Sequence, residues 1–306
     1  MIIKNYLKDP VKYGLLALSS RGLLNWMPDS MYLRCMYWAR IKKKLNLKNP
    51  KTFNEKLQWL KLHDRKPIYT TMVDKYEVKR YIADLIGAEY VIPTLGVWDS
   101  FDEIDFDALP EQFVLKTTHD SGGVVICRDK SEFDKQKAKE KLGKSLKKNY
   151  FWEGREWPYK NVMPRIIAEQ YLEDTADDAL TDYKFFCFNS VPKVMYISKD
   201  HGNEPRTDFF NMEFEHLPIL ARDPNAENPP SKPVGFEEMR KVATVLSQNV
   251  PHLRVDFFEV GSKVYVGELT FYHMSGLTEV SPPEWNQQMG EWIPLPCYTE
   301  SNKADV

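Results

Sequence analysis

The sequence is poor in cysteine and contains no long hydrophobic run. Its 306 residues include four scattered cysteines, Cys35, Cys127, Cys187 and Cys297, with no two close together. This spacing indicates neither a zinc knuckle nor a disulfide framework, so we interpret the cysteines as reduced thiols. The most apolar early segment, residues 13–18, is too short to cross a bilayer, and no small-residue cleavage site follows it. We therefore expect a cytoplasmic protein without a transmembrane segment.

A large excess of charge of either sign is also absent. The chain has 42 Lys and Arg residues against 44 Asp and Glu residues, a net charge of −2. Taken as a whole, it has no electrostatic attraction to nucleic acid or to an anionic membrane. The length allows two domains, or one domain with sizeable lobes. We expect small-molecule partners and no nucleic acid, and the sequence leaves the oligomeric state open.

The order of the predicted elements favours an α+β fold. Helices are predicted at residues 29–44, 52–62 and 74–87, where Thr52 and Glu55 form a capping box. Strands are predicted at 90–92, 96–98, 112–117, 124–128, 165–172, 183–189 and 194–198, with a lysine-rich helix at 131–150. Residues 205–233 are predicted to be a long loop, typical of a lid or binding segment, and residues 235–248 a helix. A βαβα rhythm is missing, which argues against a doubly wound sheet.

Residues 253–270 are predicted to form a β-hairpin, because two alternating β-branched and aromatic runs flank a short turn. With a three-residue loop at 261–263, one face of the hairpin would carry Asp256 opposite Glu268 and Arg254 opposite Thr270. Opposed carboxylates repel unless a proton or cation lies between them, and Mg²⁺ held together with substrate phosphates suits this oxygen-only set. A two-residue turn would instead place the acids on opposite faces. An exposed face of alternating charges is the simplest alternative.

Three upstream segments carry weaker signals. Lys116 ends a predicted strand and is followed by a small-residue loop, whose backbone N–H groups could approach phosphate oxygens. A simple hairpin turn is the alternative, and the loop is not a Walker motif because its lysine precedes the glycines. An apolar strand ends in acids at residues 169–173. Lys184 opens a strand that is otherwise suited to the core.

Taken in order, five segments resemble the TupA-like branch of the ATP-grasp superfamily, found in surface-polysaccharide clusters. They are Asp74-Lys75, Phe-Val-Leu-Lys with its Ser-Gly-Gly loop, Glu-Gln-Tyr-Leu-Glu, Asp-Tyr-Lys-Phe-Phe-Cys-Phe, and Arg-Val-Asp-Phe with Gly-Glu-Leu-Thr-Phe. They fall within residues 45–292. The resemblance implies two α+β lobes that grip ATP. It divides the chain into a helical N-terminal region (1–92), a small lobe (93–175) and a large lobe with the metal site (176–306).

The resemblance also implies roles for individual residues. The phosphates of ATP would contact Lys116 and Lys184, under a loop formed by His119, Ser121, Gly122 and Gly123, and Lys75 would contact either a phosphate or the acceptor substrate. The hinge that reads adenine would be Glu169, Gln170, Tyr171 and Leu172, with Glu173 or Asp177 on the ribose. The Mg²⁺ ligands would be Asp256, Glu268 and Thr270. Catalysis would rest on Arg254 and Lys184, which stabilise the transferring phosphoryl group, and on Ser275, which binds the acyl substrate.

Three positions depart from the family pattern. Thr270 stands where many ATP-grasp enzymes have asparagine, which leaves a second metal in doubt. Asp120 stands where glycine is expected in the phosphate loop, and its charge would repel phosphate unless it faces solvent or meets a cation. His273 lies where small residues or proline are expected. It could shape acceptor specificity, replace a metal ligand or be a surface histidine.

The implied activity is that of an ATP- and Mg²⁺-dependent carboxylate–amine ligase. It would form an amide through an acyl phosphate on a uronic acid or amino acid, in the biosynthesis of a capsular or other cell-surface polysaccharide. A metal-dependent glycosyltransferase is the main alternative, because Asp105-Phe106-Asp107 could bind a sugar nucleotide through a metal. A non-catalytic nucleotide-binding protein is the other alternative, with the three departures as its signs.

Overall fold

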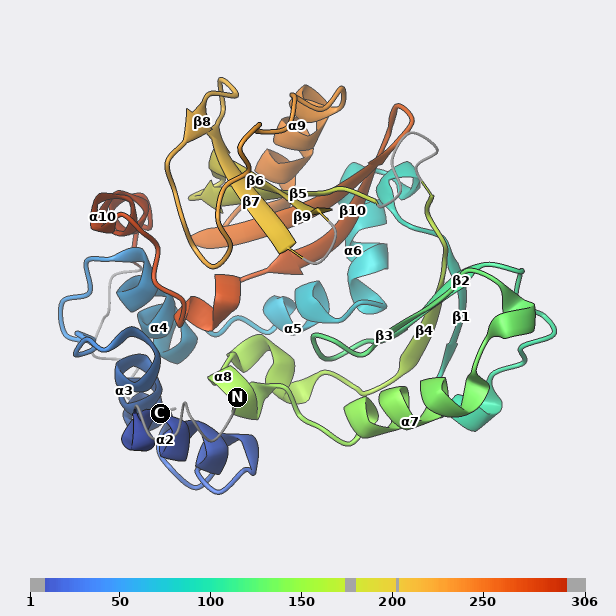
Figure 1. The fold of residues 1–306 in the computed structure, drawn as a ribbon, viewed down its shortest axis with the longest axis horizontal. Helices are drawn as coiled ribbons and strands as arrows, with labels where there is room; N and C mark the ends of the chain where they lie inside the picture. Colours follow the sequence, from blue (N-terminus) through green and yellow to red (C-terminus); the bar gives the residue numbers. More distant parts are fainter. Residues whose placement is uncertain (1–8, 174–179, 202–203, 296–306) are drawn as a thin grey trace.

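The fold is built from two antiparallel sheets and the helices around them (Figure 1). The structure is a computed structural model that describes residues 9–173, 180–201 and 204–295. Each sheet contains only antiparallel pairs of named strands in this part of the chain. The predicted α+β class is confirmed. The division into three parts stays a prediction.

Helices dominate the chain before the first sheet. They are α2 (Pro10–Ser20), α3 (Asp29–Ile41), α4 (Phe53–His63), α5 (Ile68–Val73), α6 (Glu77–Ile86) and the 3₁₀ helix η1 (Ala88–Tyr90). The capping box at the start of α4 is confirmed, because Thr52 Oγ1 accepts the Glu55 N–H and Glu55 Oε2 accepts the Thr52 N–H. The strand predicted at residues 90–92 is wrong: this segment ends η1 and forms one isolated bridge, from Val91 to Val266.

The smaller sheet has four strands in the order β1-β4-β2-β3. They are β1 (Thr94–Trp98), β2 (Phe113–Thr117), β3 (Val124–Cys127) and β4 (Ile166–Gln170), joined by η2 (Phe101–Glu103), η3 (Lys130–Glu132), α7 (Lys135–Leu146), α8 (Phe151–Gly154) and η4 (Trp157–Asn161). The lysine-rich helix is shorter than predicted at both ends. The Asp134 side chain accepts the Lys137 N–H and fixes its start. Ala138 and Leu142 of this helix pack against Phe113 and Leu115 of the sheet.

The larger sheet has six strands in the order β10-β9-β5-β6-β7-β8. They are β5 (Asp182–Phe188), β6 (Val191–His201), β7 (Glu204–Asn211), β8 (His216–Leu217), β9 (His252–Val260) and β10 (Lys263–Thr270), followed by η5 (His273–Gly276) and α10 (Pro283–Glu291). The loop prediction is wrong for β7, where Phe209 and Phe210 are both 2% exposed. The prolines and asparagines farther along the segment favoured a loop prediction for the whole of residues 205–233. Helix α9 (Phe236–Leu246) contributes Phe236 and Met239 to the same core.

The turn of the β9–β10 hairpin differs from the prediction. Lys263 pairs with Val260, so the turn has two residues rather than three. An unbroken ladder from this turn would place Asp256 and Glu268 on opposite faces. The predicted three-residue loop is therefore wrong, and another feature must bring the two acids onto the same face.

That cause is a β-bulge at Gly267. The register shifts between Val266 and Glu268, and beyond the shift Asp256 lies opposite Glu268 and Thr270 opposite Arg254. One extra residue in one strand returns the following side chains to the other face. A Cβ atom at Gly267 would lie 2.7 Å from Cε2 of Phe258, which explains why glycine occupies the bulge. The predicted pairing of the four residues is thus confirmed.

Candidate active site

A cavity of about 640 Å³ lies between the two sheets and brings together six of the predicted site residues. They are Ser121, Lys184, Arg254, Glu268, Thr270 and Ser275. Ser121 follows β2 of the smaller sheet, whereas the others come from β5, β9, β10 and η5. Helix α3 and the α8–η4 segment supply further walls. Of the predicted ATP contacts in the smaller lobe, Ser121 alone lines this cavity.

Asp256 holds the two predicted catalytic cations. Its side chain is buried, and its Oδ1 and Oδ2 accept hydrogen bonds from Arg254 Nε at 2.6 Å and Nη2 at 2.7 Å. Lys184 Nζ lies 3.1 Å from Asp256 Oδ2 and 3.0 Å from Asp182 Oδ1. Burial alone would raise the pKa of Asp256, but Arg254 and Lys184 hold that pKa below its usual value. Burial alone would lower the pKa of Lys184, and the two aspartates raise it instead. Asp256, Arg254 and Lys184 are therefore charged at neutral pH.

Glu268 is the more available of the two opposed carboxylates. Its side chain is 34% exposed and lines the cavity, with Arg254 Nη2 at 3.8 Å from its Oε2. Thr270 Oγ1 accepts a hydrogen bond from the same nitrogen at 3.0 Å. Among the described residues, no group of three or more His, Cys, Asp and Glu side chains could hold a metal. Mg²⁺ is commonly bound by one or two carboxylates together with substrate phosphates. Glu268 therefore suits Mg²⁺ that arrives with a nucleotide, whereas both carboxylate oxygens of Asp256 already accept hydrogen bonds from Arg254.

His273 is not a surface residue. It is 5% exposed, and its Nδ1 lies 2.9 Å from Arg254 Nη1. Because arginine can only donate, Nδ1 accepts this hydrogen bond and is not free to ligate a metal. Burial, with Arg254 in second place, lowers the pKa of His273 well below its usual value, so the ring is neutral. His273 thus orients the arginine that the sequence singled out.

The predicted hinge begins at a buried ion-pair cluster. Glu169 on β4 lies between two lysines, with Oε2 at 2.5 Å from Lys116 Nζ and Oε1 at 2.6 Å from Lys79 Nζ. Burial alone would raise the pKa of Glu169, but the lysines lower it. Both carboxylate oxygens of Glu169 are thus paired with lysines. Gln170 donates its N–H to Pro93 O at 3.0 Å. The rest of the hinge, Tyr171, Leu172 and Glu173, directly follows β4, and Asp177 lies outside the described residues.

Asp120 does not face the phosphate site. Its buried carboxylate accepts hydrogen bonds from the hydroxyl groups of Thr117 and Ser145. The repulsion expected from this acid is therefore avoided by hydroxyl partners inside the lobe, rather than by solvent or a cation. Lys75 donates a hydrogen bond from Nζ to the Asp120 carbonyl oxygen. This contact joins the Asp74-Lys75 segment to the predicted phosphate loop.

The His119 side chain anchors the loop and is absent from the lining of the cavity. It is 2% exposed, and its Nε2–H donates to the carbonyl oxygens of Ser145 and Lys148 at 3.2 and 3.0 Å. Gly122, with φ of 102°, adopts a conformation that favours glycine. The loop is thus fastened to the end of α7 on one side, while Ser121 lines the cavity.

Sequence reasoning missed a buried cluster at the floor of the cavity. Lys61 on α4 is 0% exposed and donates from Nζ to Gly154 O at 2.8 Å, Ser275 O at 2.7 Å and Ser275 Oγ at 2.9 Å. Burial lowers the pKa of Lys61 to about 8, opposed by Glu156. Burial raises the pKa of Glu156, opposed by Lys61 and by a hydrogen bond from Ser275.

This cluster supports an unusual turn. Met274, Ser275 and Gly276 have consecutive φ values of 48°, 55° and 61°. Non-glycine residues pay a conformational cost in this region, so neighbouring contacts must compensate. Lys61 and Gln58 bind the carbonyl oxygen of Ser275. The position of Lys61 between two leucines of α4 was a sequence signal that could have revealed this support.

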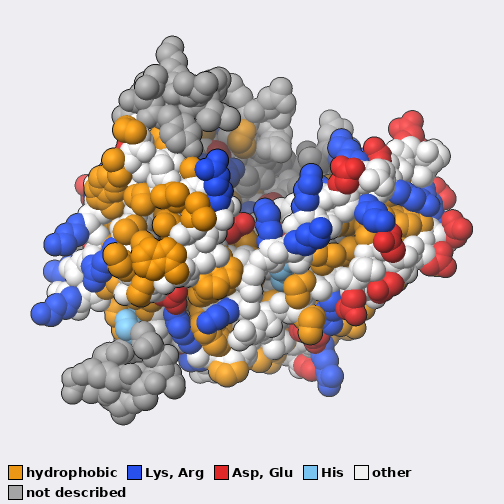
Figure 2. All heavy atoms as spheres, turned by 90° about the horizontal axis from the view of Figure 1, so that it is seen from below, with side chains coloured by type: hydrophobic (Ala, Val, Ile, Leu, Met, Phe, Trp, Pro, Cys, Tyr) orange, Lys and Arg blue, Asp and Glu red, His pale blue; other side chains and the backbone are white. Residues whose placement is uncertain are grey.

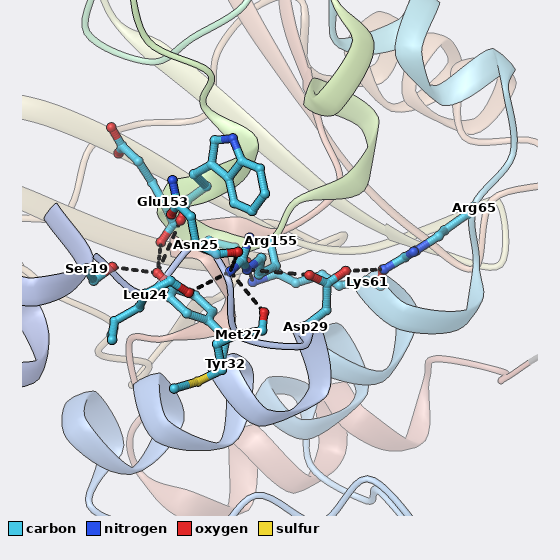
Figure 3. Close-up of polar contacts among 12 residues, drawn as sticks. Ser19, Leu24, Asn25, Met27, Asp29, Tyr32, Lys61, Arg65, Glu153 and Arg155 are labelled. Atoms are coloured by element: carbon cyan, nitrogen blue, oxygen red, sulfur yellow. Dashed lines mark hydrogen bonds and ion pairs between the residues drawn. The ribbon is translucent and has the colours of Figure 1, made fainter. Parts of the chain in front are cut away.

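A second buried cation ties the N-terminal helices to the cavity wall (Figure 3). Arg155 is 0% exposed, and its Nη2 donates to the carbonyl oxygens of Leu24, Asn25 and Met27 at 3.1 to 3.3 Å. Tyr32 Oη donates to Glu153 O at 3.0 Å. Glu153 and Gly154 line the cavity, as do Met36 and Arg40 of α3. The N-terminal helices are therefore part of the site's framework.

The family model for TupA-like ATP-grasp proteins matches residues 55–294. No curated protein sequence matches the chain significantly. The solved D-alanine–D-alanine ligase from Bacillus anthracis is 14% identical and has a TM-score of 0.44; the match covers 73% of this chain and 66% of that one. D-alanine–D-alanine ligase from Helicobacter pylori is 14% identical with a TM-score of 0.39, and the match covers 79% of this chain and 69% of that one. D-cycloserine synthetase DcsG is 18% identical with a TM-score of 0.37, and the match covers 74% of this chain and 72% of that one. The chain thus spans just under two thirds of the Bacillus anthracis ligase.

Proposed function

The chain belongs to the TupA-like ATP-grasp family, and from this premise we propose that it is an ATP- and Mg²⁺-dependent carboxylate–amine ligase. A substrate carboxylate oxygen attacks the γ-phosphorus of ATP, ADP leaves, and an acyl phosphate forms. An amine then attacks the acyl carbon, phosphate leaves, and an amide bond results. The observation that carries this proposal is one cavity lined by Lys184, Arg254, Glu268 and Ser275, with Asp256 joined to both cations.

The cationic side of the cavity suits the phosphoryl transfer. Lys184 and Arg254 offer N–H donors in fixed positions to a phosphoryl group that gains negative charge on its oxygens. Arg254 needs little reorganisation, because Asp256, Thr270 and His273 hold its nitrogens in place. Mg²⁺, when held by Glu268 together with the nucleotide, would supply further charge neutralisation.

The acidic side of the same cavity suits an amine substrate. Glu153, Glu156, Asp182 and Asp223 line it together with Glu268. Carboxylates attract an ammonium group, which must lose a proton before it can attack the acyl phosphate. Glu156 is 4% exposed and has a raised pKa, and both properties favour a group that accepts this proton. Ser275, which hydrogen-bonds Glu156, would bind the acyl group between the two sides.

The nucleotide would lie along the smaller sheet. Lys116 and Lys75 would contact its phosphates under the loop that carries Ser121, Gly122 and Gly123. The backbone after Glu169 would read the adenine ring. The carboxylate substrate would be a uronic acid or an amino acid used in cell-surface polysaccharide biosynthesis, in the cytoplasm. A cavity of about 640 Å³ has room for a sugar-sized substrate beside a triphosphate group.

The glycosyltransferase alternative has little support in the fold. Asp105 and Asp107 are both exposed, and Asp105 Oδ1 accepts the Asp107 N–H in a surface turn. Neither residue lines the cavity.

ADP and phosphate release tests the proposal directly. Purified protein would be incubated with ATP and Mg²⁺ and with uronic acids, nucleotide-linked uronic acids or amino acids, each with and without an amine. We expect release that needs both substrates, falls at least 100-fold in Glu268→Gln, and persists in the matched surface control Asp105→Asn. Turnover of a sugar nucleotide without ATP, lost in Asp105→Asn, would overturn the ligase proposal.

A further inference from the structure

The net charge of −2 conceals a strongly uneven distribution along the chain. Residues 1–48 contain ten Lys and Arg residues but only two acids, Asp9 and Asp29. This segment therefore carries a net charge of +8, and the remaining 258 residues carry −10. Basic charge of this density attracts anionic partners even when the whole protein does not. The whole segment precedes the residues that match the family model, so the proposed ligase chemistry does not account for it.

The same segment exposes hydrophobic side chains. Six of the fourteen large hydrophobic residues that are exposed in the described part of the chain lie between residues 11 and 38. They are Val11 and Leu18 on α2, Leu23 and Trp26 in the connecting turn, and Met31 and Trp38 on α3. We call these six residues the apolar face. Each helix contributes a pair spaced by seven residues, which places both members on the same side of that helix.

The exposure is not a sign of loose packing. Leu15 and Leu16 of α2 pack against a buried cluster that includes Leu24, Met27 and Tyr32. The helix nevertheless has no buried residue, and Trp26 is 76% exposed. Helix α2 is thus held on one side only. Its outer side presents apolar surface that no described part of the chain covers.

Basic residues border the apolar face. Lys12 and Arg21 lie within two residues of its members, and Lys42–Lys44 directly follow α3. Lys43 pairs with Glu279, and Lys42 Nζ lies 4.4 Å from the Trp38 ring while pairing with Asp9. That ion pair joins the start of α2 to the end of α3. Seen from the side on which α2 lies in Figure 1, hydrophobic side chains gather on one end of the molecule with Lys and Arg at their edges (Figure 2).

We propose that the apolar face and its basic border dock the protein on an anionic lipid bilayer. Exposed leucine and tryptophan with surrounding lysine and arginine is the combination that holds peripheral proteins at a headgroup interface. No described helix is long and apolar enough to span a membrane, so the contact is with the surface. A symmetric contact with a second copy is disfavoured, because it would bring two segments of charge +8 together.

Docking would also orient the cavity. Arg155 and Tyr32 fasten the N-terminal helices to α8, and α3 and α8 both supply residues that line the cavity (Figure 3). A bilayer that holds α2 and α3 therefore holds one wall of the site. The site would face substrates from a fixed position relative to the membrane.

Sedimentation of the full chain with vesicles tests the proposal. The vesicles would be pure phosphatidylcholine, or phosphatidylcholine with 30% phosphatidylglycerol, at low and at high salt. We expect binding to the phosphatidylglycerol vesicles, at least tenfold less binding to the neutral ones, and a similar loss at high salt, because screening weakens the attraction. The tryptophan fluorescence of the wild type should shift to shorter wavelength on binding, and a variant that lacks Trp26 should show a smaller shift.

The double variant Leu23→Ser/Trp26→Ser should reduce binding at least tenfold. The matched control is Met163→Ser/Val234→Ser, which removes two hydrophobic residues of similar exposure, 65% and 86%, from elsewhere on the chain. Circular dichroism and thermal melting establish that both variants fold. Equal binding of both double variants, or no binding of the wild type, would overturn the proposal. A dimer in light scattering that is lost in Leu23→Ser/Trp26→Ser, without vesicle binding, would assign the face to a second copy instead. None of these outcomes depends on ligase activity.

Discussion

Removing the charge of Asp256 should destabilise the folded protein strongly. Its carboxylate is the shared partner of Arg254 and Lys184, whose side chains are 9% and 14% exposed. In Asp256→Asn an amide replaces it, and the amide NH₂ group would face a cation. Breaking a buried ion pair by removing one partner costs about 3–5 kcal/mol. Asp182, 3.0 Å from Lys184, and Glu268, 3.8 Å from Arg254, offset part of this cost, so we expect about 2–4 kcal/mol.

Urea unfolding of the nucleotide-free protein at pH 7, followed by intrinsic fluorescence, measures this loss. Lys184→Met alone should also be destabilising, and the double variant should lose less than the sum of the single losses, because the residues are in contact. The control is Asp102→Asn, which breaks an exposed ion pair with Lys139 and should have too small an effect to measure. A loss below about 1 kcal/mol in Asp256→Asn, or strictly additive losses, would refute the assigned role of this carboxylate.

Three further predictions concern stability. Glu169→Gln should be less stable than the wild type at pH 7. Because the pKa of Glu169 is lowered in the folded protein, its contribution to stability is lost as pH falls through that pKa, so the difference in unfolding free energy between the two proteins should shrink below about pH 4. Burial lowers the pKa of His252 to about 3, so this residue alone should contribute a fall of about 1.4 kcal/mol per pH unit to the unfolding free energy below about pH 6.5. Urea denaturation at pH 6.5 and pH 5 should therefore show a smaller fall in His252→Gln than in the wild type. Gly267→Ala should cost about 1–3 kcal/mol in urea unfolding because its Cβ would meet the Phe258 ring, whereas Gly143→Ala, in open space on α7, should stabilise the protein.

Local patterns were enough to predict the pieces of the site. The alternating hairpin strands pointed to Asp256 and Glu268, and the capping box fixed the start of α4. The predicted turn length was wrong, but the bulge at Gly267 still places the two acids on the same face, as predicted. The bulge depends on how Gly267 packs against Phe258 on the neighbouring strand, and the alternation of hydrophobic residues in the sequence does not reveal that contact.

Contacts between distant segments could not be predicted. Lys61, Glu156 and Ser275 meet at the cavity floor although about a hundred residues separate each from the next. No spacing rule links such positions, and burial of a lysine runs against its usual preference for the surface. Asp120 was recognised as unusual, but its partners, two hydroxyl groups, became visible only when α7 was placed beside the loop.

The ion pairs of the cleft carry a consequence for nucleotide binding. Each phosphate-binding cation predicted in the sheets already has a carboxylate partner: Lys116 has Glu169, and Lys184 and Arg254 share Asp256. A polyphosphate therefore meets cations whose charge is largely balanced. Its own charge must be met in another way, and Glu268, which is one-third exposed, can share a divalent cation with it.

We therefore expect nucleotide affinity to depend steeply on Mg²⁺. In isothermal titration calorimetry, ADP should bind the wild type at least tenfold more weakly when EDTA replaces Mg²⁺. In Glu268→Gln the two affinities should be nearly equal and close to the Mg²⁺-free value, because the available metal carboxylate is gone. Asp105→Asn, an acid removed far from the cavity, should keep the wild-type dependence. Equal ADP affinity of the wild type with and without Mg²⁺ would mean that the lysines release their carboxylates to the phosphates, and the charge-balance argument would fail.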